Sequence, residues 1–121
     1  MKKLFFDTYA LIELIKGNSA YARYSDDNVL TSQFNLVELY YSLISDFDKE
    51  LAKKLYLKFK GCVHTITDEV IFEAMELKKM HKKMRLSYVD CIGYVCAKQN
   101  NVKFLTGDKQ FQSMSNVEYV K

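Results

Sequence analysis

The order of apolar and polar residues along the chain predicts short strands that alternate with helices. Residues 3–6 form an apolar run of strand length, and Thr8–Lys16 is a mostly apolar helix that ends at Gly17. The other predicted strands are residues 28–31, 62–66, 102–106 and 117–120, and the other predicted helices are residues 33–45, 48–60, 67–84 and 87–99.

This alternation favours an α/β fold with a central parallel sheet of about five strands and helices on both faces. The length of 121 residues fits one domain, residues 1–121. Residues 87–99 are apolar nearly all round, so we expect this helix to be the most buried one. Because open parallel sheets bind ligands beyond the carboxyl ends of their strands, that edge is where functional residues are expected.

Composition and charge exclude several classes of protein without naming a function. Hydrophobic residues make up 49% of the chain and charged residues 27%, as in ordinary globular proteins, and the net charge of +3 is too small to indicate a nucleic-acid binder. Three cysteines argue against a disulfide framework, and their spacing argues against a structural zinc site. Asp7 interrupts the first apolar run, and no segment approaches the roughly 18 apolar residues of a membrane span. We therefore expect a cytoplasmic protein without a membrane segment.

Two acidic residues follow predicted strands directly. Asp7 comes after residues 3–6, and Asp108 comes after residues 102–106, so both are expected at the carboxyl edge of the sheet. Each also has a structural interpretation, because Asp7 suits the N-cap of the helix that follows and Asp108 suits a turn after Gly107.

Two further acids lie on helices that are otherwise apolar. Glu38 shares a polar stripe with Asn35 and Ser42, which is equally typical of a solvated helix face. Asp90 is the only charged residue between Arg85 and Lys98, and a buried carboxylate needs a partner. The alternative for Asp90 is a capping box, in which Ser87 is the N-cap and Asp90 is the N3 residue.

Taken together, the four acids indicate a site for a cation. Carboxylates gathered at one edge of a sheet repel one another unless a positive charge lies between them. Oxygen ligands without nearby Cys or His select hard cations, chiefly Mg²⁺, with Mn²⁺ also admitted. Such a centre suits the hydrolysis of phosphodiester bonds.

The residues around these acids resemble the four acidic motifs of PIN-domain nucleases. The motifs are Phe5-Phe6-Asp7-Thr8, Asn35-Leu36-Val37-Glu38-Leu39, Ser87-Tyr88-Val89-Asp90-Cys91-Ile92 and Thr106-Gly107-Asp108-Lys109-Gln110-Phe111. In size and layout the chain is most similar to the VapC-type toxins of toxin–antitoxin pairs.

This resemblance implies a Mg²⁺- or Mn²⁺-dependent endoribonuclease that acts on RNA, forms a homodimer and is inhibited by a cognate antitoxin protein. By the same resemblance, Asp7, Glu38, Asp90 and Asp108 are the catalytic and metal-binding acids. Thr106 matches a hydroxyl residue two positions before the last acid, and Thr8 is a further supporting residue.

The chain departs from the family pattern at two places. Many members carry another acid shortly after the last aspartate, where this chain has Lys109 and Gln110. Cys91 stands where an alanine often follows the third aspartate. The first departure weakens a second metal position, so we expect one firmly bound ion.

A run of basic residues, numbers 78–85, predicts an RNA-binding surface. Lys79, Lys82, Lys83 and Arg85 are the candidate phosphate contacts, although such a run is equally typical of a solvated helix face. Two functions of different class remain open at this point. One is an active ribonuclease, and the other is a catalytically silent PIN-like module that binds RNA or acts as a scaffold.

Overall fold

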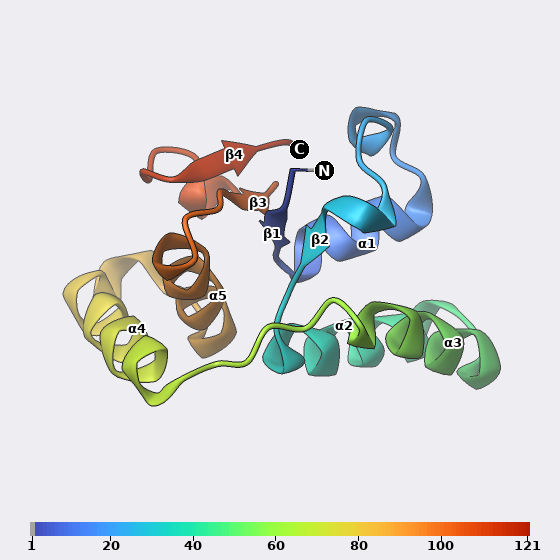
Figure 1. Cartoon of the computed structure of the whole chain (residues 1–121), viewed down its shortest axis with the longest axis horizontal. Helices are drawn as coiled ribbons and strands as arrows, with labels where there is room; N and C mark the ends of the chain where they lie inside the picture. The colour runs from blue at the N-terminus through green and yellow to red at the C-terminus, as the bar shows by residue number, and fades with distance from the viewer. Residues whose placement is uncertain (1) are drawn as a thin grey trace.

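The protein has a four-stranded parallel sheet with helices on both faces, which confirms the predicted fold class (Figure 1). The computed structural model describes residues 2–121. The strand order is β2-β1-β3-β4, and all three neighbouring pairs are parallel. The strands are short and comprise β1 (Leu4–Phe6), β2 (Val29–Leu30), β3 (Phe104–Thr106) and β4 (Val117–Tyr119).

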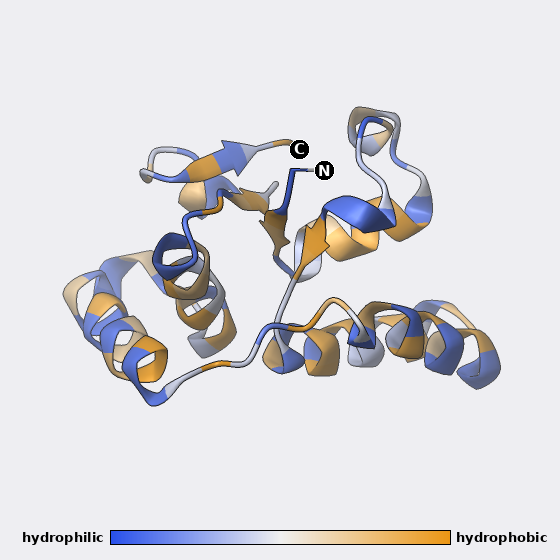
Figure 2. Cartoon of the chain, viewed as in Figure 1, coloured by the Kyte–Doolittle hydropathy of each residue, from blue (hydrophilic) through white to orange (hydrophobic). Residues whose placement is uncertain are grey.

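Alternation along β1 separates the core into two layers. Leu4 and Phe6 belong to one apolar cluster, and Phe5 between them belongs to the other, because successive strand residues point to opposite faces. All three side chains are buried. Figure 2 shows the central strands as mainly hydrophobic segments. The central strands β1 and β3 are buried on both sides, so their polar neighbours lie at the strand ends.

The helices divide between these two layers. The Leu4 and Phe6 side packs against helices α1 to α3, and the Phe5 side packs against α4 and α5. In Figure 1, α2 and α3 lie side by side, as do α4 and α5. Their bounds are α1 (Thr8–Lys16), α2 (Gln33–Asp46), α3 (Lys49–Lys60), α4 (Asp68–Met80) and α5 (Tyr88–Gln99).

Helix α5 is the most deeply buried helix, as predicted. Residues 91–97 are buried without interruption, and Ser87 caps the helix through a hydrogen bond from the Asp90 backbone N–H. No helix within residues 2–121 is long and apolar enough to cross a membrane.

Two predicted elements differ in the structure. The helix predicted over residues 67–84 ends at Met80, and a separate 3₁₀ turn, η3 (Lys82–Met84), follows it. Lysines four positions apart (Lys78 with Lys82, Lys79 with Lys83) disfavour a continuous helix here by about 0.2–0.5 kcal/mol for each pair. Arg85 then reverses the chain with a left-handed backbone (φ 55°).

The strand predicted over residues 62–66 is reduced to one bridge between Thr31 and Val63. Thr31 donates to the Cys62 carbonyl at 3.0 Å and accepts from the His64 N–H at 2.8 Å. The neighbouring strand β2 has only two residues, so it offers too short an edge to pair with a fifth strand.

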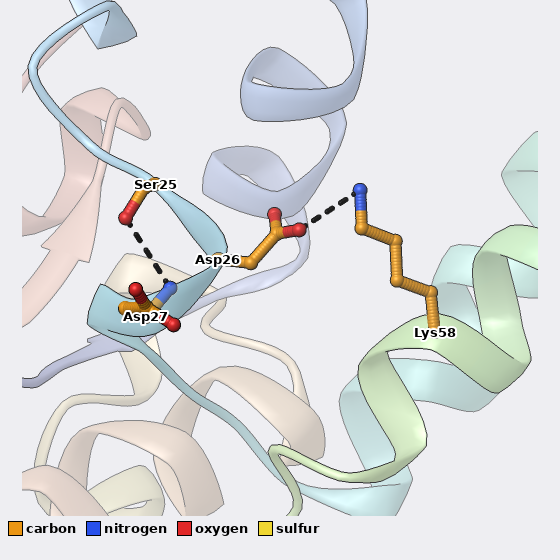
Figure 3. A network of polar contacts seen from close by, with 4 residues as sticks. All are labelled: Ser25, Asp26, Asp27 and Lys58. Carbon is orange, nitrogen blue, oxygen red and sulfur yellow. Dashed lines mark hydrogen bonds and ion pairs between the residues drawn. The ribbon is translucent and has the colours of Figure 1, made fainter.

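A surface ion pair connects α3 to the turn that precedes β2. Lys58 Nζ lies 3.0 Å from Asp26 Oδ2, and in the same turn Ser25 accepts from the Asp27 backbone N–H (Figure 3). Both charged side chains are about half exposed, so the pair contributes at most about 1 kcal/mol to stability. It holds the β2 entry near α3 without involving the sheet edge.

Candidate functional site

The carboxyl ends of the two central strands bring Asp7 and Thr106 together. Strands β1 and β3 are neighbours, and the Asp7 backbone N–H donates to the Leu105 carbonyl at 3.2 Å. Asp7 directly follows β1, and Thr106 is the last residue of β3. Parallel pairing therefore places Asp7 at the carboxyl edge of the sheet, where it was predicted.

Asp7 is a buried carboxylate with a strongly perturbed pKa. Its side chain is 3% exposed, and its Oδ1 accepts from the Ala10 N–H at 2.8 Å as the N-cap of α1. The pKa of Asp7 is raised from 3.8 to about 7, mainly by burial and also by the nearby carboxylates Asp90 and Asp108, while the Thr106 hydroxyl and the Ala10 N–H lower it. Asp7 is thus the N-cap of α1, as one interpretation predicted. Capping does not account for the two further acids, Asp90 and Asp108, close to it.

Thr106 joins Asp7 to Asp108. Its side chain is fully buried, its hydroxyl lowers the pKa of Asp7, and its Oγ1 accepts from the Asp108 backbone N–H at 3.0 Å. Asp108 is also the N-cap of the 3₁₀ turn η4 (Lys109–Phe111), where its Oδ1 accepts from the Gln110 N–H at 3.0 Å. One hydroxyl group therefore holds the loop that carries Asp108 and also favours the ionised form of Asp7.

Gly107 between them is required by space. A Cβ added there would lie 2.2 Å from a ring carbon of Tyr9 and 2.6 Å from the Val120 carbonyl oxygen. Any side chain there would require the Tyr9 ring and the Val120 backbone to move, so the loop that carries Asp108 is packed closely against both.

Asp90 approaches the same region from the first turn of α5. It forms the predicted capping box, in which the Ser87 N–H donates to Asp90 Oδ2 at 3.0 Å and the Ser87 hydroxyl accepts from the Asp90 N–H at 3.0 Å. Burial raises the pKa of Asp90, and so does Asp108, while Ser87 and the cation of Lys78 lower it. Asp90 therefore belongs to the helix cap, and its pKa is also raised by the charge of Asp108.

Glu38 is held by a chain of polar side chains. Thr8 Oγ1 donates to Glu38 Oε1 at 2.7 Å and accepts from Asn35 Nδ2 at 3.2 Å. Asn35 Oδ1 in turn accepts from Ser32 Oγ at 2.6 Å. Because Asn35 and Ser32 are buried, the stripe that includes Glu38 is not simply a solvated face.

The structure thus brings the four predicted acids to one edge of the sheet, in two groups. The charges of Asp90 and Asp108 raise the pKa of Asp7, and that of Asp108 raises the pKa of Asp90. Glu38 is connected to this group through Thr8, the residue after Asp7. Their all-oxygen chemistry fits Mg²⁺ or Mn²⁺. Within residues 2–121, however, no three acidic, histidine or cysteine side chains lie close enough together to hold an ion as they stand. Coordination by three of them therefore requires side-chain rotation.

The basic residues predicted to bind RNA are on the surface, away from these hydrogen bonds. Lys79, Lys82, Lys83 and Arg85 are exposed at the end of α4 and the turn beyond it. None of them is among the groups that shift the pKa of the acids. Whether they contact RNA stays a prediction.

The sequence analysis assigned no supporting role to three residues that the structure places beside the site, namely Ser32, Asn35 and Lys78. Ser32 and Asn35 were detectable, because a serine three positions before an asparagine at a helix start is a capping pattern. From the sequence alone, Lys78 could not be distinguished from the other basic residues of the run 78–85. Only the fold shows that its side chain reaches back to the Leu86 carbonyl beside α5.

Comparisons with known proteins place this architecture. A comparison with curated sequences finds no match. Among solved structures, the chain is similar to a toxin–antitoxin complex from Klebsiella pneumoniae, with a TM-score of 0.75, 18% identity and coverage of 96% of both chains. It is also similar to VapC20 of Mycobacterium tuberculosis, a Sarcin-Ricin loop cleaving toxin, with a TM-score of 0.76, 17% identity and coverage of 98% of this chain and 100% of that one. These likenesses concern the fold. The PIN domain family model matches residues 4–117, nearly the whole sequence, so the chain belongs to the PIN-domain family.

Proposed function

We propose that this PIN domain is a Mg²⁺- or Mn²⁺-dependent endoribonuclease that works as the toxin of a toxin–antitoxin pair. The observation that carries the proposal is the group of Asp7, Asp90 and Asp108 around the buried Thr106. Carboxylates that repel one another destabilise a fold unless a positive charge, such as a bound cation, lies between them. Similarity in fold to a toxin–antitoxin complex and to an RNA-cleaving toxin supports the biological role.

Asp7, Asp90 and Asp108 would hold the ion, with Glu38 as the fourth oxygen donor. A divalent ion bound there would orient the scissile phosphate and lower the pKa of a water molecule. Hydrolysis by water joins the water oxygen to phosphorus and breaks the bond from phosphorus to the 3′ oxygen. The products therefore have 5′-phosphate and 3′-hydroxyl ends.

The protein's own residues prepare this chemistry. Thr106 holds the Asp108 loop and lowers the pKa of Asp7, and Thr8 donates a hydrogen bond to Glu38. With a pKa of about 7, Asp7 is partly protonated near neutral pH and must release its proton to act as a ligand. We therefore expect cation binding to release protons and to weaken below pH 7.

The test is cleavage of RNA by the purified protein with Mn²⁺ or Mg²⁺, and with EDTA as the control. Because a toxin can be selective for one RNA, total cellular RNA is the substrate, and the new ends are mapped by sequencing. We expect internal cuts that leave 5′-phosphates and disappear with EDTA. Cuts that survive EDTA, or that leave 2′,3′-cyclic phosphates, would contradict the metal-dependent mechanism.

A catalytically silent PIN-like module is the second candidate, and one observation favours it. Asp7, Asp90 and Asp108 all accept backbone hydrogen bonds as caps, which gives each a structural role without any metal. Such a module would bind RNA but leave total RNA intact under every metal condition, so the same experiment separates the two.

The proposal includes two protein partners, a second copy of the chain and a cognate antitoxin. Helices α2 and α3 expose large apolar side chains, including Val37 (61%), Tyr41 (73%) and Leu57 (63%). A recess of about 490 Å³ lies between these helices and includes Val37 and Leu57 in its lining. Exposed apolar area of this kind supports a protein contact. Sedimentation velocity should show a dimer, and a purely monomeric protein would count against it.

A further inference from the structure

A second recess lies between α4 and the start of α5, and its lining combines cations with an aromatic ring. It measures about 470 Å³ and is lined by Met75, Lys78, Lys79, Lys82 and Tyr88. Among residues 2–121, none of those that line it is acidic. A surface that offers three cations and no carboxylate attracts an anionic ligand.

Tyr88 is a large aromatic residue whose side chain is mostly exposed to solvent. Its side chain is 65% exposed, although it begins the helix that is otherwise the most buried. Lys78 Nζ lies 5.0 Å from the centre of its ring, so a cation already covers part of the ring surface. Lys78 is itself held by a hydrogen bond to the Leu86 carbonyl. The ring and the ammonium group are therefore a preorganised pair.

The recess adjoins the acidic edge of the sheet. Tyr88 and Asp90 share the first turn of α5, and the charge of Lys78 acts on Asp90. A chain that lay across Tyr88 would thus pass within one helical turn of a candidate catalytic acid. In single-stranded nucleic acid, bases stack on aromatic rings while the backbone follows cationic side chains.

We propose that this recess is a subsite for unpaired RNA, in which one base stacks on Tyr88 and Lys79 and Lys82 bind the adjoining phosphates. Lys78 positions the ring. The inference rests on the proposed ribonuclease function and deepens it, because it names single-stranded RNA as the form of substrate at this site. An acidic protein segment would satisfy the lysines but would not depend on a nucleobase.

The test measures binding in EDTA, so that it does not depend on cleavage. Fluorescence anisotropy follows a short single-stranded RNA of mixed sequence and the same RNA with internal abasic riboses. Tyr88→Leu should weaken binding of the normal RNA about tenfold, whereas Tyr88→Trp should preserve it. Neither variant should alter binding of the abasic RNA. Thermal melts confirm folding, which is expected because Tyr88 is largely exposed.

The lysines are tested through salt. Replacing Lys79 and Lys82 together with glutamine should lower the slope of log affinity against log salt by about 1.4, because each contact with single-stranded RNA contributes about 0.7. The matched control is Lys49→Gln with Lys54→Gln on α3, which removes the same charge from exposed positions outside the recess and should leave the slope unchanged.

Several results would overturn the subsite. These are an unchanged affinity of Tyr88→Leu, an equal loss on abasic RNA, a salt slope that falls as much in the α3 control, or no binding of the normal RNA by the wild type. Tyr88-dependent binding without cleavage would remove the ribonuclease proposal and leave the subsite. RNA cleavage together with RNA binding that does not depend on Tyr88 would support the ribonuclease proposal and remove the subsite.

Discussion

The two groups of acids in the candidate site are stabilised in opposite ways. Asp7, Asp90 and Asp108 lie within range of one another's charge, and their hydrogen bonds come mainly from the backbone N–H groups that they cap. Glu38 instead accepts from Thr8, which is supported by Asn35 and Ser32.

The difference shows how a fold can keep several carboxylates in place by hydrogen bonds without pairing each of them with a cation. Backbone donors keep the aspartates in place, yet burial and repulsion still raise the pKa values of Asp7 and Asp90. The Glu38 group satisfies its buried polar atoms internally, and no buried side-chain nitrogen or oxygen within residues 2–121 lacks a hydrogen bond. The aspartate group should therefore respond to pH and metal, and the Glu38 group mainly to the loss of a hydrogen bond.

The largest expected effect is the response of the metal-free protein to pH. The pKa of Asp7 is about 7 in the folded protein and 3.8 when unperturbed, so the folded state binds a proton more tightly. This stability is fully present below about pH 4 and is lost as the pH rises to 7, by up to about 4 kcal/mol. Urea unfolding in EDTA between pH 4 and 8 measures it.

The control is Asp7→Asn, which keeps an N-cap residue and removes the titrating group. Its unfolding free energy should change much less over the same range. If the unfolding free energy of Asp7→Asn depended on pH as steeply as that of the wild type, groups other than Asp7 would cause the dependence.

The next effect concerns Asp90 as ligand or cap. Asp90→Asn removes one repelling charge, so the stability of the metal-free protein should stay level or rise. The variant should lose most of the metal-induced stabilisation, about 2.7 kcal/mol for the wild type at a hundredfold excess over the dissociation constant. RNA cleavage should fall more than about 100-fold. Thermal melts with EDTA and with Mn²⁺, beside cleavage assays, give the comparison.

Ser87→Ala is the matched control, because it breaks the cap and leaves the carboxylate. It should cost about 1 kcal/mol and retain both metal stabilisation and cleavage. If Asp90→Asn behaved in the same way, Asp90 would be a helix cap and not part of a metal centre.

The smallest effect is expected at Thr8. Thr8→Val removes the hydrogen bond to Glu38 and leaves the buried Asn35 amide without its acceptor, which should cost about 1–2 kcal/mol. Thr8→Ser keeps the hydroxyl and should remain close to wild type. Urea unfolding at pH 5 and pH 8 should show the same loss at both values. A loss that varied with pH would mean that Glu38 shares the repulsion of the aspartates.

Much of the fold followed from local patterns. Apolar runs predicted β1 and β3, and Gly17 and Ser87 marked the end of one helix and the start of another. The position of Asp7 and Asp108 after strands predicted the edge at which they lie. Local chemistry decides these features, because capping, periodicity and strand alternation depend only on neighbours in the sequence.

The sequence also determined the order and spacing of the acidic motifs, from which the resemblance to the PIN family was drawn. Tertiary structure decided what surrounds those acids. The burial of Asp7, the hydroxyl of Thr106 between Asp7 and Asp108, and the Tyr9 ring against Gly107 join residues about 100 positions apart. Lys78 likewise became distinct from its neighbours only where α4 packs on α5. Burial and electrostatic repulsion depend on distances in space, and no pattern of neighbours along the chain encodes those distances directly.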